Sequence, residues 1–121
     1  MQVQQKRGII FKRIDLKLSG NDHLAIIAAL GVVTDLGLEE SDEQAVLNAG
    51  LASSASKKLS SGSGSFSPNE ARMVLAAVSF ARLILSGALD ADPEQKRALA
   101  PYLFNYNRLY PQLAPLGDML P

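Results

Sequence analysis

Hydrophobic and polar residues alternate strictly near the N-terminus of the chain. Between residues 13 and 18 every second residue is apolar, so that an extended chain has Ile14, Leu16 and Leu18 on one face. This period of two is typical of a β-strand with one buried face. Residues 2–6 are placed to pair with that strand as a short hairpin. The pattern therefore predicts an N-terminal strand.

A helix is the alternative for the same stretch. Ile10, Ile14 and Leu18 also follow one another at intervals of four residues. In that helix, however, Leu16 would lie on the polar side. We therefore prefer a strand or extended arm over residues 1–20.

After the arm, apolar residues recur at helical spacing, and capping residues mark the ends of each segment. Asn21 can cap a helix over residues 22–36, and Gly37 is placed to stop that helix in a left-handed conformation. The run from Leu24 to Val33 is apolar on most sides of this helix. Such a helix is typically buried.

A second helix is predicted over residues 42–56. Ser41 and Gln44 form the capping-box pattern that opens it. The following segment, residues 53–67, contains eight serines and two glycines. This composition predicts a flexible connection between helices.

The clearest local signal opens a third helix over residues 68–85. Ser67 can act as N-cap, Pro68 suits the first helical position, and Glu70 can return the capping bond. Gly87 is placed to end the helix. Its apolar residues surround most of its circumference, which predicts burial, and burial across a subunit interface would cover two such helices in a short chain.

Asp92, followed by a proline and then Gln95, predicts the start of a fourth helix. Pro101 should kink or restart this helix, because proline lacks the backbone donor. Pro111 should end it. The tail at residues 111–121 is expected to be irregular.

These elements predict a mainly α fold, a small helical bundle of about four helices with an N-terminal strand or extended arm. The 121 residues fit a single domain, with the bundle at residues 21–110. Hydrophobic residues make up 47% of the chain, enough to form a core without cross-links.

The chain contains no cysteine, which excludes disulfides and thiolate chemistry. Its longest apolar run, residues 24–33, is about half of what a membrane-spanning helix needs. We therefore expect no membrane partner and a cytoplasmic location.

Formal net charge is zero, but the charges are segregated along the chain. Residues 1–18 carry five basic residues and one acid, whereas residues 19–56 carry six acids and no Lys or Arg. The basic residues of the arm are the candidates for contact with nucleic-acid phosphates: Lys6, Arg7, Lys12, Arg13 and Lys17.

Two groups are candidates for a protein interface. The first is the apolar face of the arm, which we expect to pack on another subunit or to pair with a copy of itself, while its basic face meets the acidic segment at residues 35–43. The second is an aromatic cluster near the C-terminus, which core packing explains equally well. The candidate interface residues are Ile14, Leu16, Leu18, Tyr102, Tyr106, Arg108 and Tyr110.

No catalytic, cofactor-binding or metal-binding residue is predicted. His23 is the only histidine and is expected to face solvent in the first turn of a helix. The Ser/Gly segment lacks the glycine-then-lysine order of a phosphate-binding loop. The acids near Gly37 have the pattern of a solvated surface rather than of a catalytic pair.

The sequence thus favours a non-catalytic protein-interaction or assembly subunit that self-associates into a homo-oligomer or larger assembly. The alternative is a nucleic-acid-associated accessory protein that uses its basic N-terminal arm.

Overall fold

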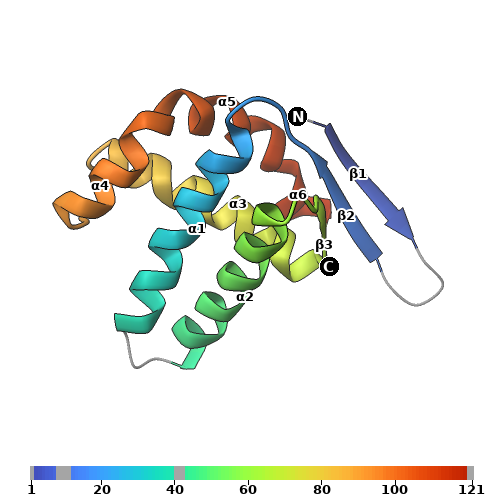
Figure 1. Ribbon diagram of the computed structural model, residues 1–121, viewed down its shortest axis with the longest axis horizontal. Helices are drawn as coiled ribbons and strands as arrows, with labels where there is room; N and C mark the ends of the chain where they lie inside the picture. The colour runs from blue at the N-terminus through green and yellow to red at the C-terminus, as the bar shows by residue number, and fades with distance from the viewer. Residues whose placement is uncertain (1, 8–11, 40–42, 120–121) are drawn as a thin grey trace.

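The computed structural model describes residues 2–7, 12–39 and 43–119 (Figure 1). Strands β1, Gln2–Arg7, and β2, Lys12–Lys17, form an antiparallel hairpin in which Gln5 lies opposite Ile14. The predicted strand and hairpin are confirmed. A third strand that the sequence did not predict, β3, Ser65–Phe66, pairs with the other edge of β2.

Helices α1, Asp22–Glu39, and α2, Glu43–Ser60, pack side by side. Helix α1 begins where predicted, with the Ala25 N–H donating to the carbonyl of Asn21. Gly37 does not stop the helix, which continues to Glu39. A glycine inside a helix costs only about 1 kcal/mol, less than packing against a neighbouring helix provides. Ser41, the predicted cap of α2, lies outside the described residues.

The prediction of a flexible connection over residues 53–67 is wrong for most of that segment. Helix α2 continues to Ser60 because small apolar residues recur among the serines at helical spacing and are buried: Ala49, Ala52, Ala55 and Leu59. Gly62, at φ +88°, then ends the helix, with the Ser63 N–H donating to the carbonyl of Lys58 over 2.8 Å. The serine content wrongly predicted a flexible segment, because the buried face of α2 consists mainly of alanine.

Helix α3, Pro68–Leu85, has the predicted bounds. The N–H of Glu70 donates to the Ser67 hydroxyl and the Ser67 N–H donates to the Glu70 carboxylate, which completes the predicted capping box. Gly87, at φ +84°, follows its C-terminal end as predicted. The helix lies at the centre of the molecule and contacts α1, α2, α5 and β2.

The C-terminal third contains α4, Pro93–Leu99, a 3₁₀ turn at Ala100–Tyr102, α5, Leu103–Leu113, and α6, Pro115–Met119. The chain restarts as a helix after Pro101, as predicted.

The prediction of an irregular tail over residues 111–121 is wrong. Helix α5 passes through Pro111, and α6 follows it. The proline removes one backbone hydrogen bond, but the buried side chains of Leu109, Leu113 and Leu116 hold both sides of it in the core.

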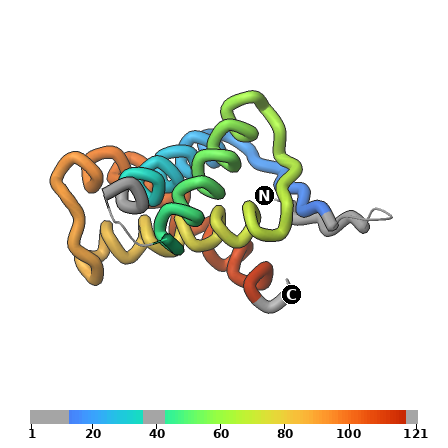
Figure 2. The backbone as a smooth tube through the Cα atoms, turned by 90° about the horizontal axis from the view of Figure 1, so that it is seen from below, coloured from blue at the N-terminus to red at the C-terminus, as the bar shows by residue number. Residues whose placement is uncertain are grey.

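The arrangement of the elements separates two ends of the molecule. Figure 1 places the β1–β2 hairpin at one end of the long axis and α4 at the opposite end, and Figure 2 shows the same separation between β2 and α4. One hydrophobic core joins β2, β3 and the helices between these ends. Within the described residues, no helix is both long and apolar enough to cross a membrane.

Candidate functional site

The apolar face of β2 is buried inside its own chain. Ile14 is 0% exposed and Leu16 is 4% exposed, and both belong to the core cluster together with Phe66 of β3. The expectation that this face needs another subunit is therefore wrong. The sequence analysis did not predict β3, which lies in the Ser/Gly segment and supplies the second strand partner of β2. Leu18 is partly buried against the same core.

Two residues of the C-terminal aromatic cluster have structural roles. Tyr106 is completely buried, and its hydroxyl donates to the carbonyl of Ala25 over 2.8 Å. Burial raises its pKa above the ordinary range. Arg108 pairs with the buried carboxylate of Asp22 on α1. The interface prediction is therefore wrong for Ile14, Leu16 and Tyr106, which have no surface to offer.

Asp22 was not singled out from the sequence. Its side chain is completely buried, and Asn105 of α5 donates to its Oδ1 over 3.0 Å beside Arg108. Burial by itself would raise the pKa of Asp22, but the donors on α5 outweigh burial and lower it. The pair fastens the start of α1 to α5. No local pattern marks this contact, because Asp22 and Arg108 are 86 positions apart.

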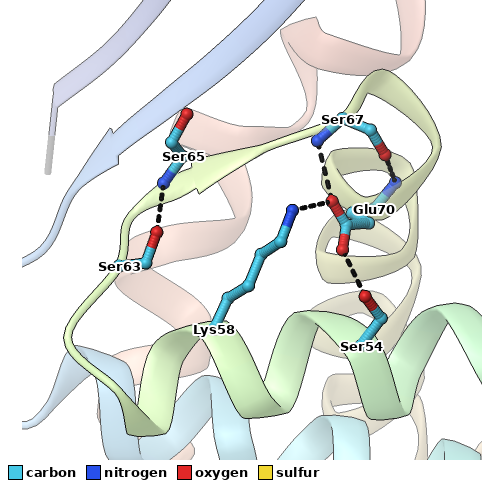
Figure 3. Close-up of polar contacts among 6 residues, drawn as sticks. All are labelled: Ser54, Lys58, Ser63, Ser65, Ser67 and Glu70. Atoms are coloured by element: carbon cyan, nitrogen blue, oxygen red, sulfur yellow. Dashed lines mark hydrogen bonds and ion pairs between the residues drawn. The ribbon is translucent and has the colours of Figure 1, made fainter.

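Glu70 forms a second buried polar cluster, which joins α2 to α3 (Figure 3). Lys58 donates to its Oε1 over 2.6 Å and Ser54 donates to its Oε2 over 2.7 Å. Burial would raise the pKa of Glu70, but these bonds and that from the Ser67 N–H lower it to about 2. Both carboxylate oxygens of Glu70 accept hydrogen bonds from α2 or from the N-cap residue Ser67. The cluster therefore has a structural role, which is to hold α2 against α3.

A groove of about 400 Å³, the α3–α5 groove, lies between α3 and α5. Tyr110 lies on its wall, and Arg82 stacks over the Tyr110 ring at 4.3 Å while donating to Asn107 over 3.1 Å. Leu83 and Leu103 are about two-fifths exposed in this groove. Tyr102, by contrast, packs edge-on against Tyr106.

Phe104 is the most exposed large apolar side chain among the described residues, at 78%. It lies one turn before Asn107, a groove residue, on α5, although Phe104 itself does not line the α3–α5 groove. Exposed apolar side chains scattered singly are normal, but an exposed aromatic near a groove that contains leucine, tyrosine and arginine side chains is typical of an interaction surface.

The strand register brings the basic residues of the arm together at one end of the hairpin. Lys6 lies opposite Arg13, and Arg7 lies opposite Lys12. Like charges at directly opposed positions destabilise a strand pair. Arg13 and Lys17 are exposed. This register places four basic residues at one end of the hairpin.

A second groove, of about 580 Å³, lies between α1 and α4 at the other end of the molecule. Its apolar lining consists of Val32 and the small residues Ala28, Gly31 and Ala98. Three carboxylate residues line it as well, and all are exposed: Asp35, Asp92 and Glu94. We call this the acidic groove. The acidic residues near position 35 were visible in the sequence. Their proximity to Asp92 and Glu94 was not predicted, because it depends on the packing of α4 against α1.

His23 is exposed in the first turn of α1, as predicted. It lines a shallow depression with Leu18 and Gly64. Among the described residues, no three His, Asp or Glu side chains are grouped so as to hold a metal ion.

Comparison with protein-family models, with curated proteins and with solved structures found no match to this chain.

Proposed function

We propose that this protein is a non-catalytic assembly subunit of the cytoplasm, and that two copies associate through their α3–α5 grooves. The observation that carries the proposal is the exposed Phe104 beside a groove lined by Leu83, Leu103 and Tyr110. A two-fold contact joins the same patch on both copies, so the patch must offer both a projection and a hollow.

The charge on this face also suits a second copy. Arg82 is its only charged lining residue, and its guanidinium is engaged by Asn107 and by the Tyr110 ring. Two such faces can approach each other with little like-charge repulsion, whereas strongly charged faces could not. Aromatic and arginine side chains are also the residues that contribute most at interfaces.

The test is the substitution Leu83→Glu. At about 500 mM salt, where contacts between exposed charges are screened, a carboxylate in the desolvated centre of the contact should convert the parent dimer into monomers, because burying an unpaired charge is unfavourable. Sedimentation velocity gives the mass of each form. The matched control is Leu47→Glu on α2, since Leu47 is 58% exposed and does not line the groove.

Both variants place a charge at an exposed position, so both should fold and melt close to the parent. A parent that sediments as a monomer would contradict the proposal. Equal dissociation of the two variants would contradict it as well.

The hairpin supports a second candidate function, association with nucleic acid. The supporting observation is the opposition of Lys6 to Arg13 and of Arg7 to Lys12 in the strand register. A polyanion would relieve this repulsion. In a gel-shift titration, Arg13→Glu/Lys17→Glu should weaken binding of labelled DNA or RNA and reduce the salt slope by about two, one for each lost phosphate contact.

A further inference from the structure

We infer that the basic face of the hairpin docks into the acidic groove of a second copy, which adds a head-to-tail contact to the self-association proposed above. The inference deepens that proposed function by naming a second pair of surfaces. It rests on the positions of two oppositely charged surfaces, since the basic hairpin lies at one end of the molecule and the acidic groove at the other.

The two surfaces cannot meet within one chain. The hairpin lies at one end of the long axis and α4 at the other (Figure 1), and the second view separates β2 from α4 in the same way (Figure 2). The basic residues of β2 therefore have no access to their own acidic groove. Any contact between these surfaces joins two molecules.

The acidic groove suits basic side chains in shape as well as charge. Ala28, Gly31 and Ala98 are small, so they leave room for the aliphatic parts of long side chains. Asp35 on α1 and Glu94 at the start of α4 supply carboxylates from the two helices. A carboxylate can accept two parallel hydrogen bonds from an arginine, the strongest form of this contact.

The hairpin offers the matching groups. Arg13 and Lys17 are exposed on β2, four positions apart, with Arg13 at the end of the strand where basic residues are concentrated. Lys96 and Arg97 of α4 are exposed too, but they do not line the acidic groove. The groove itself is therefore anionic, although α4 also has basic residues.

A contact of this kind is heterologous, because it joins two different surfaces. Such contacts close into rings or continue as open chains. Together with a two-fold contact through the α3–α5 groove, it would build assemblies larger than a dimer. Because it depends on exposed charges, this contact should weaken in salt, whereas the apolar contact should not.

The experiment is a charge exchange. One variant, Arg13→Glu/Lys17→Glu, reverses the hairpin, and a second, Asp35→Lys/Glu94→Lys, reverses the acidic groove. Each alone should raise the Kd of the salt-sensitive association roughly tenfold or more. An equimolar mixture should restore it, because each reversed surface then meets a complementary one. The readout is sedimentation velocity at about 50 mM and about 500 mM salt, on either side of substantial screening.

Folding of the variants does not confound the result. Glutamate at position 13 stands opposite Lys6, so the reversal replaces a like-charge pair with an opposite-charge pair. Asp92 is left intact because it caps α4. The control Lys96→Glu/Arg97→Glu changes the net charge as much as the reversed hairpin does, but outside the groove, and should assemble like the parent.

Each outcome has a definite meaning. A dimer at both salt concentrations without larger species would overturn the head-to-tail contact and leave the α3–α5 contact standing. A monomer at high salt that assembles at low salt would support the head-to-tail contact and overturn the α3–α5 contact. A mixture that fails to recover assembly would overturn the inference. If only the reversed hairpin loses binding to DNA and the reversed groove assembles like the parent, the hairpin's partner is nucleic acid and the inference is wrong.

Discussion

Asp22 and Glu70 are buried carboxylates that each receive a hydrogen bond from a basic residue on another helix. Arg108 of α5 contacts Asp22, and Lys58 of α2 contacts Glu70. In both cases burial pushes the pKa up, but the donors outweigh burial and the pKa is lowered. A lowered pKa means that the folded protein favours the ionised carboxylate, so these contacts stabilise the fold at neutral pH.

For Glu70 the sign of the pH dependence follows from its pKa. The pKa falls from an ordinary 4.5 to about 2 in the folded protein. The stabilisation is therefore complete above the unfolded pKa and is lost as the pH falls from about 5 towards 2. Glu70→Gln should lower the free energy of unfolding at pH 7 by on the order of 3 kcal/mol. The deficit should shrink markedly at pH 3.

Urea unfolding at the two pH values measures this difference. Glu43→Gln is the matched control, because Glu43 is an exposed carboxylate residue in the first turn of its own helix, α2, and does not line the acidic groove. Its effect should be small at both pH values. A deficit for Glu70→Gln that is the same at pH 7 and pH 3 would mean that the charge of Glu70 does not fasten α2 to α3.

At the scale of elements, the junction between β2 and β3 depends on the absence of a side chain. Leu16 donates its N–H to the carbonyl of Gly64 over 2.8 Å, so the two backbones lie close together. A Cβ at position 64 would lie 2.5 Å from the carbonyl oxygen of Leu16. Backbone on both sides leaves little freedom to relieve such a clash.

Gly64→Ala should therefore destabilise the protein by about 1–3 kcal/mol, as overpacking of a close contact does. Gly50→Ala is the control, since Gly50 lies in α2 with nothing within 4 Å of its added Cβ. That change should stabilise the helix by up to about 1 kcal/mol, because alanine is the better helix former. Thermal melts should show a lower melting temperature for Gly64→Ala and a higher one for Gly50→Ala. An unchanged melting temperature for Gly64→Ala would show that β2 and β3 can move apart without loss of stability.

At the scale of the whole molecule, the hairpin forms part of the core. Ile14 and Leu16 of β2 are buried in the core, and Phe66 of β3 is 1% exposed in the same core. Burial of a large apolar side chain contributes roughly 1.5–3 kcal/mol. A domain of ordinary stability has only about 5–15 kcal/mol in total. Loss of β2 should therefore threaten the fold itself, in addition to any effect on assembly.

Deletion of residues 1–18 should lower the melting temperature by roughly 10 °C or more, or prevent cooperative unfolding altogether. Deletion of residues 1–7 is the comparison, because it removes β1 but keeps Ile14 and Leu16 in place. Circular dichroism melts distinguish the two. If the longer deletion melts within about 3 °C of the parent, the hairpin is an appendage and its apolar face is not part of the core.

Local interactions explain what the sequence predicted correctly. The strand at β2 followed from strict alternation, and α3 followed from Ser67, Pro68 and Glu70 at its start and Gly87 after its end. These signals act within one turn or one strand, so neighbouring residues are sufficient to read them. The charged hairpin was likewise visible as five basic residues within 18 positions.

The tertiary structure decided the features that depend on distant residues. Ser54 and Lys58 lie in a helix because alanines on one face of α2 are buried against the core. Asp22 stays ionised because residues more than 80 positions away provide its donors. The acidic groove exists because α4 returns to lie beside α1. Composition and local pattern do not contain these contacts, since each depends on which surfaces the chain buries when it folds.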